Sequence, residues 1–97
     1  MTITTMAKVE NITSSRGNKV ANQFIFTDEI GNRYFQSYNS VIVKKPLEVW
    51  NKIQLDQKYW NYSNTTGKYR NIFLGETITE TKKKIKSGEY ILTDLNK

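Results

Sequence analysis

The spacing of apolar residues changes near residue 60, and this change constrains the fold more than any other feature of the sequence. Before residue 60, aromatic and β-branched residues alternate with polar ones, which is typical of strands. After it, apolar residues recur three or four positions apart, which is typical of helices. A run of strands followed by helices favours the α+β class. A chain of 97 residues has the length of a single domain, and we expect one over 1–97.

The first half predicts most of a sheet. Residues 3–9 are rich in Thr and lack Gly and Pro, and residues 14–18 follow them as a turn. The segments 20–27 and 33–43 are aromatic-rich and flank a five-residue loop that contains Gly, so we expect a hairpin. In segment 20–27, even-numbered residues are expected on one face and odd-numbered residues on the other.

The only proline ends this pattern. Pro46 lacks the N–H that a strand ladder requires, so the second hairpin strand should stop there. The segment 47–55 is compatible with a strand or a turn, and a short strand at 53–55 follows from either interpretation. A closing strand is expected at 89–93.

The second half predicts two short helices. Ser63 or Thr65 should cap a helix that runs to Leu74, with residues 69, 72 and 73 on one side and a glycine at position 75 as its stop. The sequence from Thr77 to Glu80 matches a capping box, and Gly88 should end that helix, with residues 78 and 85 as its buried seam. We therefore expect an antiparallel sheet of about four or five strands, two short helices and a closing C-terminal strand.

The chain has no His and no Cys. Their absence excludes the usual zinc sites, haem and iron–sulfur ligation, and nucleophiles activated by histidine. The acidic residues are scattered, and the adjacent pair Asp28 and Glu29 lies in an expected loop. We expect no enzyme activity, no metal and no cofactor.

The charge balance favours anionic partners. Fifteen Lys and Arg residues outnumber nine Asp and Glu residues, which gives a net charge of +6. A basic chain suits nucleic acid, although abundant Lys and Asn are also produced by AT-rich coding sequences. No stretch approaches the ~18 apolar residues of a spanning helix, and residues 1–7 lack the features of a secretory signal. We expect a soluble intracellular protein that does not enter a membrane.

Two segments carry candidate contacts. Residues 59–74 hold five aromatic residues and two cations without an acid, with hydroxyls at an expected helix start, which suits a phosphate or a stacked base. Residues 65–86 carry six Lys and Arg against two Glu. The competing interpretation is structural, with aromatic residues in the core, hydroxyls as caps and lysines on a solvated face. The candidate nucleic-acid or anion contacts are Thr65, Thr66, Lys68, Arg70, Lys82, Lys83, Lys84, Lys86, Tyr62 and Tyr69.

The block Tyr59–Glu76, YWNYSNTTGKYRNIFLGE, resembles a block in a family of small, functionally uncharacterised proteins of tailed bacteriophages. Segments 20–25 and 34–40 are similar to the upstream half of that family, and the resemblance covers roughly residues 17–95. It implies phage origin, a location in the host bacterial cytoplasm and an accessory role. It brings no catalytic residues.

The function expected from these features is that of a non-enzymatic phage accessory protein that acts by binding. Its partner is expected to be nucleic acid, or a host protein that handles nucleic acid, contacted through the basic residues of 65–86. One alternative is a protein–protein inhibitor of a host defence or replication complex, using the aromatic residues Tyr38 and Trp50. A second alternative is a minor virion or assembly component. A sheet of this size leaves open edges, which is compatible with a homodimer, although the sequence does not show one.

Overall fold

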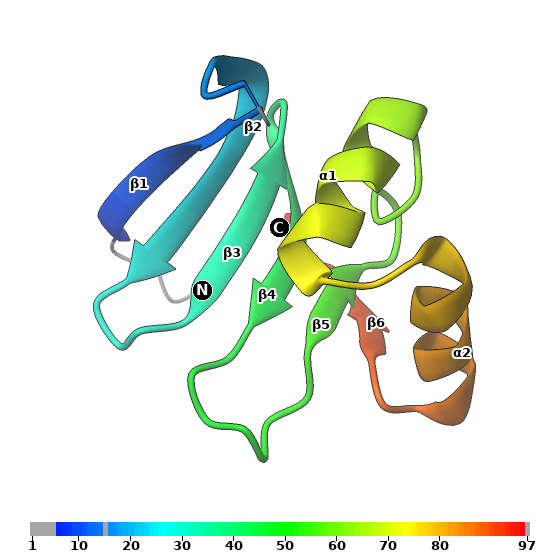
Figure 1. The fold of residues 1–97 in the computed structure, drawn as a ribbon. Coiled ribbons are helices and arrows are strands. Elements are labelled where there is room, and N and C mark those ends of the chain that lie inside the picture. The colour runs from blue at the N-terminus through cyan, green and yellow to red at the C-terminus, as the bar shows by residue number, and fades with distance from the viewer. Residues whose placement is uncertain (1–5, 15, 97) are drawn as a thin grey trace.

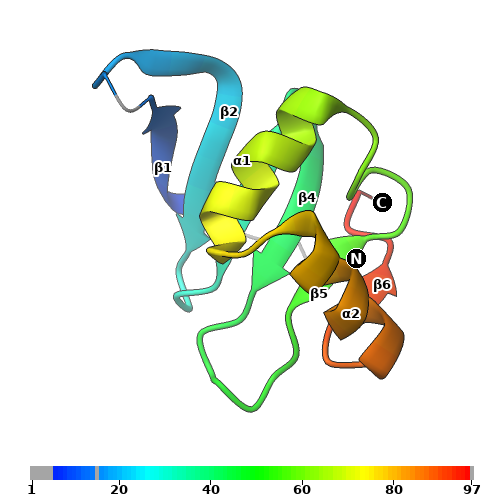
Figure 2. The ribbon, with the colours of Figure 1, turned by 45° about the vertical axis from the view of Figure 1, so that its right-hand side comes forward.

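A sheet with both helices on one face forms the body of the molecule (Figures 1 and 2). The computed structural model describes residues 6–14 and 16–96. Within these residues the chain forms β1 (Met6–Thr13), β2 (Lys19–Asp28), β3 (Arg33–Ser37), β4 (Ser40–Lys45), β5 (Gln54–Asp56), α1 (Asn64–Leu74), α2 (Ile78–Ser87) and β6 (Ile91–Thr93). Neither helix in this part of the chain has the length and apolar character needed to cross a membrane.

The strands lie in the order β1-β2-β3-β4-β5-β6, which is also their order in the sequence. Neighbours from β1 to β5 are antiparallel, whereas β5 and β6 are parallel. The α+β class is thus confirmed. The described residues also confirm the expected number of strands, with five antiparallel strands before the helices and a closing strand after them. The closing strand pairs in parallel with β5, so the sheet of six is mixed. β5 and β6 are parallel because the chain between them, which contains both helices, returns to the end of the sheet at which β5 begins.

The predicted strand at 33–43 is two strands. Tyr38 and Asn39 form a two-residue turn between β3 and β4, and Ser37 pairs with Ser40 across it. Tyr38 has φ 57°, and its N–H donates to the carbonyl of Asn22 at 2.7 Å. Glycine is the residue that usually adopts a positive φ at such a turn position. The sequence did not indicate this turn, because Tyr38 occupies the position where glycine is usual.

The predicted alternation along β2 is broken at Asn22. This residue has φ 64°, in the left-handed region, and such a residue shifts the side-chain alternation of the strand. Val20 and Ile25 consequently both pack against the core cluster, although they differ in parity. The first predicted strand is also displaced: β1 runs to Thr13, while positions 3–5 lie outside the described residues.

Both helices begin and end where the sequence predicts. Ser63 caps α1 by accepting from the Thr66 N–H at 3.1 Å, and Gly75 ends it with φ 69°. Thr77 and Glu80 form the capping box of α2. The side of α1 predicted at 69, 72 and 73 is only partly correct, because Ile72 is 60% exposed.

The core lies between the sheet and the helices. Phe35, Ile42, Val43 and Leu55 are fully buried on β3, β4 and β5. The ring of Phe73 on α1 stacks on Phe35 with centroids 5.9 Å apart. Further aromatic and aliphatic residues of the helical half pack over this cluster, and they include Trp60, Tyr69, Leu74 and Ile85. The helices are therefore fixed on the sheet by the residues whose spacing predicted them.

Candidate functional site

Arg70 on α1 is buried, and both terminal nitrogens of its guanidinium donate to neighbouring protein groups. Its side chain is 1% exposed, and its guanidinium carbon lies 5.3 Å from the ring centroid of Trp60. Nη1 donates to the Trp60 carbonyl at 2.7 Å and to Asn61 Oδ1 at 3.0 Å, and Nη2 donates to Asn71 Oδ1 at 2.9 Å. Burial lowers the pKa of Arg70, and the charge of Glu76 opposes that shift. Arg70 therefore fastens the segment before α1 to the helix and offers no surface to an anion.

The hydroxyl cluster at the start of α1 is mostly used inside the protein. Thr66 is fully buried, and its Oγ1 lies 2.8 Å from Ser37 Oγ on β3 in a hydrogen bond. Ser63 Oγ donates to the same Thr66 oxygen at 3.0 Å. Gln23, paired with Ser37 across the sheet, is buried beside them. The predicted anion site is therefore corrected: Thr66 and Arg70 are enclosed, and only Thr65 of the two threonines is exposed.

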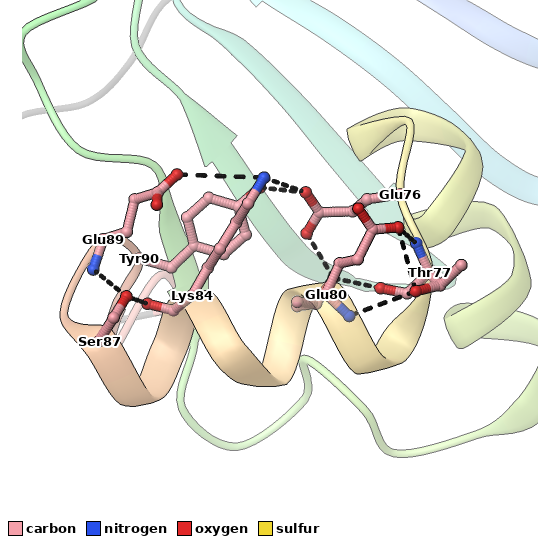
Figure 3. A network of polar contacts seen from close by, with 8 residues as sticks. Glu76, Thr77, Glu80, Lys84, Ser87, Glu89 and Tyr90 are labelled. Carbon is pink, nitrogen blue, oxygen red and sulfur yellow. Dashed lines mark hydrogen bonds and ion pairs between the residues drawn. The ribbon is translucent and has the colours of Figure 1, made fainter.

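A buried carboxylate organises the second helix (Figure 3). Glu76 lies between the helices with its side chain 4% exposed. Its Oε1 accepts from Lys84 Nζ at 2.7 Å and from the Tyr90 hydroxyl at 2.8 Å, and its Oε2 accepts from Thr81 Oγ1 at 2.6 Å. Burial alone would raise the pKa of Glu76, but these three donors outweigh it and leave that pKa lowered.

The Glu76 carboxylate also affects the pKa values of Lys84 and Tyr90. Glu76 raises the pKa of Lys84, mainly through their hydrogen bond, so the ammonium stays charged. Burial, followed by the hydrogen bond to Glu76, raises the pKa of Tyr90 to about 12. Lys84 also lies 4.0 Å from Glu89 and 5.4 Å from the Tyr90 ring. Lys84 was predicted as an external contact, and the structure instead pairs it with the buried Glu76 while its own side chain stays 34% exposed.

The other three lysines of α2 face outward. Lys82, Lys83 and Lys86 are exposed, and none forms an ion pair within residues 6–14 and 16–96. At about 100° per residue, they fall within an arc of about 100° on the helix surface. We call these three residues the lysine arc. Lys68 on α1 is also exposed, with its ammonium 5.3 Å from the Tyr69 ring.

The predicted aromatic contacts are scattered. Tyr62 is 44% exposed and makes an edge contact with Tyr59, whereas Tyr69 packs against the core. Tyr38 precedes β4 and Trp50 follows it, so these two residues lie at opposite ends of that strand. They do not form one surface.

Sequence reasoning missed a groove beside the β4–β5 loop. It has a volume of about 590 Å³ and opens at the end of the sheet where Trp50 lies, 79% exposed. Its lining comes from the β2–β3 turn, β4, the β4–β5 loop, β5 and β6, and consists of Ile30, Asn32, Lys44, Pro46, Glu48, Trp50, Asn51, Lys52, Gln54 and Ile91. The only signal in the sequence was the unusual density of apolar residues in the ambiguous segment after Pro46.

Comparison with known proteins gives one match. The sequence model of a protein family described as "Family of unknown function (DUF8033)" matches residues 7–91. No curated protein and no solved structure matches the chain.

Proposed function

This chain belongs to a protein family of unknown function, DUF8033, and we propose from its geometry that it is a non-enzymatic protein that binds nucleic acid. The lysine arc of α2 is the surface that supports this proposal. The carrying observation is the separation of four neighbouring lysines into two groups: Lys84 neutralises the buried Glu76, while the other three stay exposed and unpaired among the described residues.

The arc has the properties of a phosphate contact. Its three ammonium groups project from about 6 Å of helix axis, at 1.5 Å per residue. Lysines act as point charges and contact phosphates without reading base edges. Each phosphate neutralised on B-DNA contributes about −0.9 to the slope of log affinity against log salt, so the arc predicts a slope near −3. Binding should be salt-dependent and independent of sequence.

The resemblance of residues 59–76 to tailed-phage proteins supports a more specific form of the proposal. In this form, the protein is a phage accessory factor that acts in the host bacterial cytoplasm on nucleic acid or on a host protein that handles it. A protein–protein inhibitor is the second candidate, and the exposure of Trp50 favours it.

Fluorescence anisotropy with labelled single- and double-stranded DNA and RNA, at ~50 and ~200 mM salt, tests the nucleic-acid proposal. We expect binding at low salt and a loss of about tenfold or more in the triple variant K82Q/K83Q/K86Q. The matched control R16Q/K19Q/K58Q removes the same charge from exposed residues on other elements and should lose much less. Absence of binding at low salt, or equal losses in both variants, contradicts the assignment to α2.

A further inference from the structure

Exposed apolar side chains gather at the end of the sheet that holds Trp50. Val49 is 95% exposed, and the neighbouring positions Leu47, Ile30 and Ile91 are also exposed. They come from the β4–β5 loop, the β2–β3 turn and β6, and all three of these segments line the same groove. The loop projects beyond the sheet beside the end of α2 in both views (Figures 1 and 2). Grouped exposed apolar residues of this kind mark interaction sites.

The loop that presents Trp50 is braced at several points. The Leu47 N–H donates to Asn32 Oδ1 at 3.1 Å, and Lys52 Nζ donates to the Gly88 carbonyl at 2.7 Å. Within the loop, the Asn51 N–H donates to the Glu48 carbonyl at 3.1 Å. These bonds tie the loop to the β2–β3 turn on one side and to the end of α2 on the other. A braced loop loses little conformational entropy when a partner binds.

The charges in the groove select the partner. Lys44 and Lys52 line it together with one acidic residue, Glu48, and none of the three forms an ion pair among the described residues. Lys45 is exposed at the end of β4. The excess of cations favours an anionic partner.

The exposed apolar side chains beside the groove distinguish between two classes of anionic partner, nucleic acid and acidic peptide. Aliphatic side chains such as Val49 and Leu47 cannot donate hydrogen bonds to phosphates, whereas they pack readily against apolar side chains of a protein. Tryptophan is enriched among the residues that dominate protein interfaces. These observations favour a peptide over a nucleic acid.

We propose that this groove binds a short acidic segment of a partner protein. An apolar side chain of the segment packs against the Trp50 indole, and its carboxylates pair with Lys44 and Lys52. The volume of about 590 Å³ lies within the range of ligand-binding clefts. The groove contains no residue of the lysine arc. Peptide binding can therefore be tested independently of nucleic-acid binding.

Selection from a random peptide display library on the immobilised full chain tests the proposal. We expect the enriched peptides to share an apolar residue flanked by Asp or Glu. An enriched peptide should bind in solution with affinity reduced about tenfold or more by Trp50→Ala. Tyr62→Ala removes another exposed aromatic residue away from the groove and serves as the control. The variant K44E, which leaves the Lys52 brace intact, should reduce the preference for acidic peptides, and circular dichroism verifies that each variant is folded.

Three outcomes overturn the proposal. One is a selection with no enrichment above an uncoated surface, and another is enrichment without acidic residues or without dependence on Trp50. The third is a labelled 20-mer of deoxythymidine that binds in a Trp50-dependent manner and displaces the selected peptide, because it assigns the groove to single-stranded nucleic acid.

Discussion

The guanidinium of Arg70 lies against the ring of Trp60 at 5.3 Å and also donates a 2.7 Å hydrogen bond to the carbonyl of that residue. One side chain thus holds both the backbone and the indole of the segment that precedes α1. The sequence suggested an external cation at this position, and the structure shows an internal fastening.

Arg70→Ala should lower the free energy of unfolding by about 3 kcal/mol, because it leaves the Trp60 carbonyl and two Asn side chains without their charged donor and opens a cavity. Arg70→Lys should recover only part of this loss, since a single ammonium cannot reach all three acceptors. Urea denaturation measures both. Lys68→Ala, an exposed change on the same helix, is the control and should stay within about 0.5 kcal/mol. Equal effects of the two alanine changes contradict this role.

Glu76 should make stability depend on pH in the acid range. Its pKa is lowered in the folded protein, because three donors outweigh its burial, so its stabilisation is present above the unfolded pKa and is lost as pH falls through the folded pKa. The difference in melting temperature between wild type and Glu76→Gln should therefore shrink as pH falls below about 4.3. Glu29→Gln, at an exposed position of the β2–β3 turn, is the matched control. A difference that stays constant from neutral pH to pH ~3 would contradict the ionised network.

Tyr90 should titrate at high pH, since burial and the Glu76 hydrogen bond raise its pKa to about 12. Its protonated hydroxyl stabilises the fold fully below the unfolded pKa of about 10, and that stabilisation is lost as pH rises through the folded pKa. Ultraviolet absorbance of the phenolate follows this titration. We expect a phase near pH 12 to disappear in Tyr90→Phe and to move to lower pH in Glu76→Gln. A late phase that survives in Tyr90→Phe assigns it to another residue.

Tyr38→Gly should stabilise the protein by about 1 kcal/mol, because glycine adopts the positive φ of this turn position without the steric penalty that tyrosine has. Asn39→Gly is the matched control: its φ is not positive, so added backbone freedom should be neutral or destabilising. Thermal unfolding measures both changes. A loss of stability in Tyr38→Gly would show that contacts of the phenol ring outweigh the backbone strain.

Local signals predicted the helices well. Ser63, the Thr77–Glu80 capping box and the glycines at positions 75 and 88 act within one helical turn, so their chemistry is visible in the sequence. The two left-handed residues, Asn22 and Tyr38, were not visible, because they are held by a hydrogen bond between segments far apart in the chain.

Packing, which the sequence does not show, decides which of the candidate lysines are exposed. In the sequence, Lys82, Lys83, Lys84 and Lys86 are chemically equivalent. Only the packing of α2 against Glu76 and the segment before β6 distinguishes Lys84 from the rest. The groove at Trp50 is likewise assembled from segments that lie far apart in the sequence, so no local pattern indicates it.

The parallel pairing of β5 with β6 also sets the order in which the molecule can be completed during synthesis. Both helices lie in the chain between these strands, and Leu95 and Asn96 then hydrogen-bond back to Asp56 and Val41. The first five strands can pair as they emerge from the ribosome, because each is followed directly by its neighbour in the sheet. α1 can dock on β3 through Phe73 and Thr66 before residues 91–96 emerge. The Tyr90 hydroxyl that binds Glu76 emerges only after both helices, so the contacts that hold α2, the helix with the lysine arc, are completed later.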